Sequence, residues 1–228
     1  MRITKLAVPA ILLGLVASTA LASPFTIVSQ LTGDPRVGNP DNLVVDVTIV
    51  GDTTSAVVNW TVDINSPLHP DVKLDEFYFN MVGLGTDYSF SAINPSDWAI
   101  ATPASTAGGG SIAFLFEALD PPGPPDAANI TNAQDLTFTM TKVSGNFLTS
   151  DFLNAPSSCS SDAVLGCGQL GAHLQSLLVA GAAQSDSGFA LAGYVRTSPD
   201  IPVPEPATLA LLGAAMAGMA WARRRKLS

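Results

Sequence analysis

Short runs in which apolar and polar residues alternate recur along the middle of this 228-residue chain. In the clearest run, Leu136, Phe138 and Met140 alternate with threonines. Comparable runs cover residues 43–49, 58–64, 77–81, 112–116 and 189–195. Because successive side chains of a strand point to opposite faces of its sheet, each run predicts a strand with one buried face. Many such strands predict an all-β fold, a single antiparallel β-sandwich of the jelly-roll or Ig-like type.

The segments between these runs are rich in turn-forming residues. Gly51 and Asp52 are expected to form the short hairpin turn between two of the strands. The stretch Pro121–Pro125 predicts a stiff extended loop, since proline cannot occupy a central strand. Residues 169–180 are ambiguous, because their leucines fit a helical stripe and, less well, one face of a strand.

The N-terminus has the three parts of a secretory signal peptide. Arg2 and Lys5 form a positive region, residues 6–20 are mostly apolar, and Ala20-Leu21-Ala22 fits the small-x-small rule for cleavage. We therefore expect residues 1–22 to be a signal helix that is removed between Ala22 and Ser23. The alternative is a permanent N-terminal membrane helix, but the apolar run is short for that role.

The C-terminus also has three parts in a fixed order. A proline-rich hinge is followed by the apolar residues 207–222 and then by a basic cluster. The hinge is Val203, Pro204, Glu205 and Pro206, and the cluster is Arg223, Arg224, Arg225 and Lys226. As a helix the apolar part would span roughly 24 Å, somewhat less than a hydrocarbon core of roughly 30 Å. The basic cluster is expected to stay in the cytoplasm, which places the preceding chain outside the inner membrane.

This tail, residues 203–228, closely resembles the PEP-CTERM sorting signal of exported bacterial proteins. The resemblance implies a Gram-negative host that makes exopolysaccharide and an exosortase-type enzyme that cuts near Pro204-Glu205-Pro206. It also implies a precursor that is anchored in the inner membrane before it reaches the cell surface or the extracellular space. The alternative is an ordinary C-terminal anchor. Residues 171–175 and 187–189 resemble strands near the end of many PEP-CTERM ectodomains, which favours a strand at 170–179.

The charge of the chain is strongly acidic outside the two terminal signals. Six of its ten basic residues and one of its nineteen acidic residues, Glu205, lie in those signals, so four basic and eighteen acidic residues remain, a net charge of −14. Such a surface repels nucleic acid, which we do not expect as a partner. The chain has no P-loop, GxGxxG or HExxH motif, and we expect neither a cofactor nor a metal site.

Cys159 and Cys167 are the only cysteines. In an exported protein a single pair is expected to form a structural disulfide, which here would close a loop of nine residues. The alternative is a redox or metal-binding pair, but the spacing differs from CxxC and there is no second pair of cysteines.

Residues that could support catalysis or binding are scattered and form no recognised motif. The candidates are His69, His173 and Ser187 for a hydrolase, Asp75, Glu76, Glu117 and Asp120 for glycoside hydrolysis, Asp120, Asp126 and Asp135 for weak calcium binding, and Tyr88 and Trp98 for stacking on a sugar. Each has a simpler interpretation as a turn, surface or core residue. We therefore expect no enzymatic activity from the ectodomain, residues 23–200.

The sequence supports three hypotheses for function. The first is an exported, surface-sorted or matrix-associated protein with a structural or adhesive role in a biofilm matrix. The second is a carbohydrate-binding module with exopolysaccharide as its partner, for which exposed aromatic residues on one sheet face would be the discriminating observation. The third is an extracellular hydrolase, which requires His69 or His173 within hydrogen-bond reach of a serine or carboxylate in a cleft.

Overall fold

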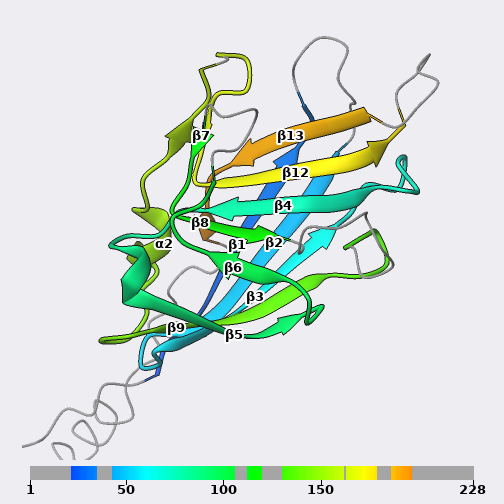
Figure 1. The fold of residues 1–228 in the computed structure, drawn as a ribbon. Helices are drawn as coiled ribbons and strands as arrows, with labels where there is room; N and C mark the ends of the chain where they lie inside the picture. Colours follow the sequence, from blue (N-terminus) through cyan, green and yellow to red (C-terminus); the bar gives the residue numbers. More distant parts are fainter. Residues whose placement is uncertain are drawn as a thin grey trace, which may run out of the picture.

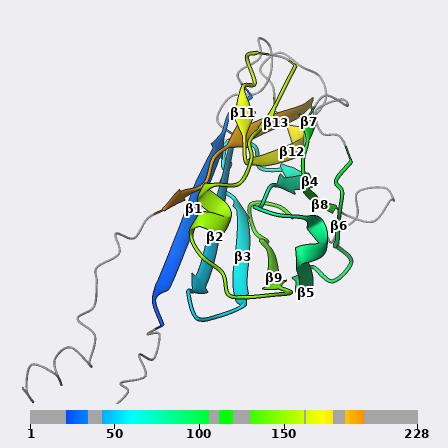
Figure 2. The ribbon, with the colours of Figure 1, turned by 90° about the vertical axis from the view of Figure 1, so that its left-hand side faces the viewer.

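The computed structural model describes residues 22–34, 43–105, 112–119, 130–161, 163–178 and 186–196. These residues form two large antiparallel sheets whose strands cross at an angle, together with a small two-stranded sheet (Figures 1 and 2). The predicted all-β antiparallel fold is thus confirmed. The predicted signal helix and C-terminal membrane helix lie outside the described residues, apart from Ala22.

The first sheet has six strands in the order β14-β1-β2-β3-β9-β5. Its strands are β1 (Pro24–Thr32), β2 (Val44–Asp52), β3 (Val57–Ile64), β5 (Tyr88–Asn94), β9 (Leu136–Lys142) and β14 (Val195–Arg196). The alternation found in the sequence is visible in β9, where Leu136, Phe138 and Met140 are buried and the threonines between them are partly exposed.

The second sheet has five strands in the order β13-β12-β4-β8-β6. Its strands are β4 (Lys73–Phe79), β6 (Ala99–Ala101), β8 (Phe116–Leu119), β12 (Leu170–Leu177) and β13 (Asp186–Ala192). The remaining elements are η1 (Gly85–Asp87), α2 (Ser150–Leu153), β7 (Ile112–Ala113), β10 (Ser158–Cys159) and β11 (Cys167–Gly168). The segment 170–179 is therefore a strand over most of its length, as the resemblance implied.

One hydrophobic core receives side chains from both large sheets. Trp60 of β3 lies near its middle, with ring centroids 4.8 Å from Phe79 of β4 and 5.2 Å from Phe138 of β9. Phe152 of α2 and Tyr194 pack against the same tryptophan, at 6.1 and 6.2 Å. Each such aromatic pair adds about 1 kcal/mol beyond the area that it buries, so this cluster holds the two sheets together.

A second, smaller cluster covers the opposite face of the five-stranded sheet. It consists of Tyr78, Ile112, Phe114 and Phe189, all buried, and we call this face the outer face. Tyr78 lies between Phe77 and Phe79 on β4, and alternation along the strand turns it away from the main core. A Cβ added at Gly171 would approach the rings of Phe189 and Phe114 to about 3 Å, so the absence of a side chain there leaves room for the cluster.

Three details of the sequence-based prediction are wrong. Gly51 and Asp52 belong to β2, and the turn follows them because the Asp52 carboxylate accepts the Thr54 N–H at 2.7 Å. The run 112–116 was expected to have one buried face, but Phe116 enters the main core while Ile112 and Phe114 enter the outer cluster. Phe189 likewise lies in the outer cluster and Val195 is exposed, because β13 and β14 belong to different sheets.

Candidate functional site

A β-bulge in β4 places two consecutive acidic side chains on the outer face. Glu76 pairs with His173 of β12 and Leu74 pairs with Leu174, so Asp75 is the extra residue of β4. Leu74 and Phe77, which flank the two acids, both belong to the main core. Asp75 and Glu76 therefore both project away from that core, which the two-residue period of a regular strand would not allow.

The imidazole of His173 lies between these two carboxylates. Its Nδ1 is 2.9 Å from Asp75 Oδ2 and 3.3 Å from Glu76 Oε2. The hydrogen bonds to Asp75 and then Glu76 raise the pKa of His173 to about 9, although burial acts in the other direction. The same hydrogen bond from His173 is the main cause that lowers the pKa of each carboxyl group. At neutral pH the cluster is an imidazolium held by two ionised carboxylates.

Each carboxylate is also oriented by a neighbouring side chain on the same face. The Tyr78 hydroxyl donates a hydrogen bond to Glu76 Oε2 at 2.6 Å, and the side chain of Gln175 hydrogen-bonds to Asp75. Burial raises the pKa of Tyr78, so its hydroxyl stays protonated and remains a donor. The cluster still reaches solvent, with 29%, 37% and 32% of the side chains of His173, Asp75 and Glu76 exposed.

This arrangement suits charge pairing or cation binding better than acid–base catalysis. A general acid in a glycosidase needs a carboxyl group whose pKa is raised, and the pKa values of Asp75 and Glu76 are both lowered. Glu117, a third candidate, is buried and accepts the N–H and the hydroxyl of Ser105 at 2.7 and 2.8 Å. These two hydrogen bonds hold Ser105 next to β8.

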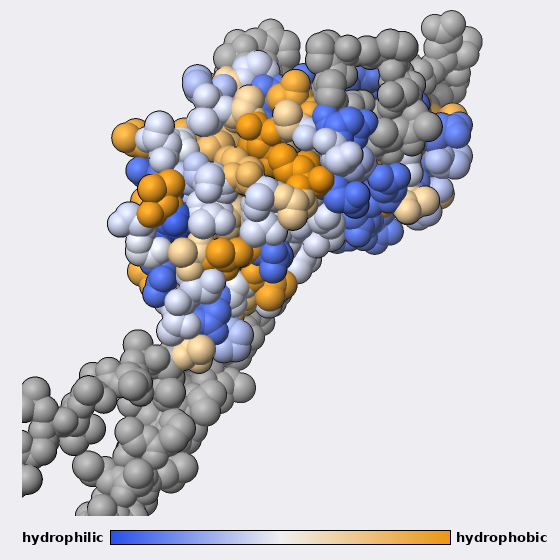
Figure 3. Space-filling view, turned by 60° about the horizontal axis from the view of Figure 1, so that its bottom comes forward, coloured by the Kyte–Doolittle hydropathy of each residue, from blue (hydrophilic) through white to orange (hydrophobic). Residues whose placement is uncertain are grey.

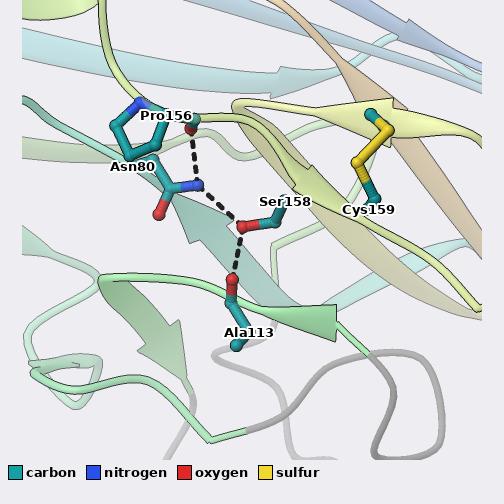
Figure 4. The surroundings of a disulfide bond; sticks show 6 residues. Asn80, Ala113, Pro156, Ser158 and Cys159 are labelled. Atoms are coloured by element: carbon teal, nitrogen blue, oxygen red, sulfur yellow. Dashed lines mark hydrogen bonds between the residues drawn. A yellow bond between two sulfur atoms is a disulfide. The ribbon is translucent and has the colours of Figure 1, made fainter.

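The predicted disulfide between Cys159 and Cys167 is present and joins β10 to β11. Asn80 lies beside it and donates hydrogen bonds to the Pro156 carbonyl at 2.9 Å and to Ser158 Oγ at 2.8 Å (Figure 4). The Ser158 hydroxyl in turn donates to the carbonyl of Ala113. The disulfide-closed loop is thus attached to the end of β4 by part-buried hydrogen bonds of Asn80.

The other candidate residues are placed in structural roles. His69 is buried, and its Nδ1 accepts the N–H of Leu178 at 3.1 Å. Trp98 and Tyr88 are buried in the main core and not available for stacking on a sugar. Of the proposed calcium ligands, Asp135 contacts Asp63, while Asp120 and Asp126 lie outside the described residues. Ser187 is exposed on β13.

Of the two terminal signals, only Ala22 lies within the described residues. Ala22 and Ser23, on either side of the expected cleavage site, are exposed and directly precede β1. The hinge Val203–Pro206 and the cluster Arg223–Lys226 lie outside the described residues, as does the apolar stretch 207–222. Within the described ranges, no helix has the length and apolar character to cross a bilayer.

Comparison with protein families assigns the C-terminal residues. A profile for the PEP-CTERM protein-sorting motif matches residues 202–226. This chain carries the PEP-CTERM sorting motif. The motif implies export, processing by an exosortase and sorting to the cell surface. Neither the curated proteins nor the solved structures provide a match to this chain.

The sequence alone did not bring Asp75, Glu76 and His173 together. His173 is 98 positions from Asp75 along the chain, and the contact depends on the pairing of β12 with β4. One local signal was available: in Leu74-Asp75-Glu76-Phe77 two polar residues separate two apolar ones, which breaks the alternation and is the pattern of a bulge.

Proposed function

We propose that this protein is a structural or adhesive component of the cell surface or the extracellular matrix of a Gram-negative bacterium. The observation that carries the proposal is the sorting motif at residues 202–226. In this proposal the precursor is held in the inner membrane with its ectodomain in the periplasm. An exosortase-type enzyme then cuts within the hinge and releases or transfers the ectodomain.

The proposal divides the chain into three parts. Residues 1–22 act as a signal peptide, residues 23–200 fold as one β-sandwich of the jelly-roll or Ig-like type, and residues 203–228 are the sorting signal. Support for the middle part comes from the two antiparallel sheets and the core that receives side chains from both. A disulfide also suits the oxidising compartments outside the cytoplasm.

A role in contact with other molecules is supported by apolar side chains on the surface. Val82 and Leu84 near η1 and Val143 and Leu148 near α2 are 40 to 68% exposed. The two segments adjoin, because the N–H of Val82 donates to the carbonyl of Asp151 at 3.1 Å. Figure 3 shows one face of the molecule, on which apolar side chains gather and hydrophilic ones border them. Exposed apolar area of this kind favours contact with partners.

A non-enzymatic role agrees with the ionisation of the cluster of Asp75, Glu76 and His173. His173 is within hydrogen-bond reach of two carboxylates, which meets part of the requirement set for a hydrolase. However, its pKa of about 9 makes it a poor general base at neutral pH. The lowered pKa values of Asp75 and Glu76 make both carboxyl groups unsuitable as general acids.

Binding of exopolysaccharide through aromatic stacking receives less support. Among the described residues no aromatic side chain is exposed, and Trp60, Trp98, Tyr78, Tyr88 and Tyr194 are all buried. A carbohydrate-binding module therefore stays the second hypothesis, and it would have to use polar contacts with the acidic surface instead.

Replacement of Pro204, Glu205 and Pro206 by alanine tests the proposal. Alanine has the highest helix propensity, so we expect the helix to extend through the hinge and hide it from the processing enzyme. In a host that has an exosortase, the wild-type protein should lose its C-terminal segment, and the variant should accumulate uncut in the inner membrane. Membrane fractionation with intact-mass analysis measures both results.

A matched control carries alanine at Ser198, Pro199 and Asp200, just before the motif. This control should be processed like the wild-type protein. If the wild-type protein keeps its full mass through Ser228, or if the hinge variant is trimmed as well as the control, the tail is an ordinary anchor and the proposal fails.

A further inference from the structure

Three potential metal ligands from two strands converge on the outer face of the five-stranded sheet. Asp75 and Glu76 of β4 and His173 of β12 each offer one ligand atom, and these atoms all lie within 4.8 Å of one another. The sequence alone predicted no metal site. The cluster combines an imidazole with two carboxylates, a donor set that proteins use for zinc and related transition metals.

We propose that Asp75, Glu76 and His173 form a Zn²⁺-binding site. The distances from the imidazole nitrogen to the two carboxylates are close to those required. Ligand atoms about 2.0 to 2.1 Å from a tetrahedral zinc ion lie about 3.3 Å from one another. His173 Nδ1 is 3.3 Å from Glu76 Oε2 and 2.9 Å from Asp75 Oδ2, so the ion needs only a small opening of the second contact. The ion would then replace the proton that the imidazole now shares with the carboxylates.

The backbone and the neighbouring side chains hold these ligands in place. The bulge turns both carboxylates to the same side of β4, which a regular strand cannot do. Tyr78 donates a hydrogen bond to Glu76 at 2.6 Å and Gln175 hydrogen-bonds to Asp75, so each carboxylate has an outer partner. Outer partners of this kind fix the orientation of metal ligands and typically affect affinity about 10- to 100-fold.

The chemistry of the donors selects a class of metal. Calcium and magnesium prefer oxygen ligands in larger number, whereas an imidazole nitrogen favours zinc, copper or nickel. Three protein ligands leave one position of a tetrahedral zinc ion open, and the exposure of the three side chains lets water or a donor from another molecule reach it. The site is independent of the sorting motif and does not rest on the proposed function.

Isothermal titration calorimetry with zinc chloride tests the proposal. The full-length protein is purified in detergent without a polyhistidine tag and kept in a buffer with excess Ca²⁺ and Mg²⁺, which occupy weak oxygen sites. We expect saturable binding of a single zinc ion per chain, reversed by EDTA. His173→Gln and Asp75→Asn should each weaken binding by at least about ten-fold, and Tyr78→Phe should weaken it by a similar factor.

The matched control is Asp46→Asn. Asp46 is a carboxylate of the six-stranded sheet that accepts hydrogen bonds from Gln30 and Asn65, and its replacement should leave zinc affinity unchanged. Circular dichroism in EDTA verifies that each variant is folded, and Glu76→Gln substitutes for a variant that is not. Absence of saturable zinc binding overturns the proposal. So does equal affinity in wild-type protein and the folded ligand variants, or an equal loss in Asp46→Asn.

Discussion

Asp46 and Asp63 lie directly opposite each other on the adjacent strands β2 and β3. Burial raises the pKa of Asp63, and the charges of Asp135 and Asp46 raise it further. The carboxylate of Asp46 is stabilised by hydrogen bonds from Gln30 at 2.8 Å and from Asn65 at 3.3 Å. Like charges that face each other across two strands destabilise a sheet, so Asp63 is a weak point of the six-stranded sheet.

We expect Asp63→Asn to raise the free energy of unfolding by about 0.5 kcal/mol at pH 7. The pKa of Asp63 is higher in the folded protein than in the unfolded chain, so ionisation favours unfolding. The gain from the variant should therefore be full above the folded pKa and should vanish as the pH falls below the usual aspartate value of 3.8. Urea unfolding at several pH values measures it.

Asp52→Ala is the control, and it should change stability in the opposite direction. Hydrogen bonds from the side chain and N–H of Thr54 lower the pKa of Asp52, so loss of this carboxylate should reduce stability at pH 7. If both variants change stability in the same direction, electrostatic repulsion does not explain the raised pKa of Asp63.

Asn80→Ala should cost about 3 kcal/mol of unfolding free energy. The side chain donates to the Pro156 carbonyl and Ser158 Oγ, and its Oδ1 accepts the N–H of Leu115 at 2.8 Å. Truncation leaves these part-buried groups without this partner, which costs more than the net value of the hydrogen bonds. Thermal and urea unfolding measure the loss. Asn59→Ala, which removes one exposed contact with Thr139, should change stability by less than about 0.5 kcal/mol.

Much of the fold could be predicted because burial follows the alternation of residue types. Trp60 on β3 and Phe138 on β9 are buried as the two-residue period requires. Prediction from alternation fails where a strand is buried on both faces. Tyr78 and Phe189 pack outward into a second cluster. When both faces of a strand are buried, the identity of an apolar residue does not indicate which face it occupies.

The cluster of Asp75, Glu76 and His173 could not be predicted, for a different physical reason. His173 meets Asp75 only because β12 pairs with β4 in a register that shifts at the bulge. Periodicity indicated β4 and the resemblance favoured a strand at 170–179, but neither contained the pairing of these strands, which lie 98 residues apart. The sorting signal, by contrast, is contiguous, and its three parts were recognisable without any tertiary contact.

Loss of the disulfide should destabilise the protein without unfolding it. The bond joins Cys159 and Cys167 on the paired strands β10 and β11, and neither strand belongs to the two large sheets. Closing a loop of this length stabilises a protein by about 2.5 kcal/mol, so Cys159→Ser should lower the unfolding free energy by about that amount. Protein taken from the periplasm should have the intact mass of the oxidised form and yield a linked Cys159–Cys167 peptide. Recovery of two alkylated cysteines under non-reducing conditions would contradict the bond.

The orientation of the precursor can be tested at its C-terminus. Of the two flanks of residues 207–222 only the C-terminal one is basic, so the cluster Arg223–Lys226 should stay in the cytoplasm. A reporter that is active only in the cytoplasm should therefore work when it is fused after Ser228, and a phosphatase that is active only in the periplasm should not. The same phosphatase fused after Asp200, in a chain that lacks the tail, is the control and should be active. Replacement of the four basic residues by glutamine should weaken this asymmetry, because the orientation then loses its main determinant. Phosphatase activity from the fusion after Ser228 would show that the tail crosses the membrane completely, and would rule out a basic stop for export.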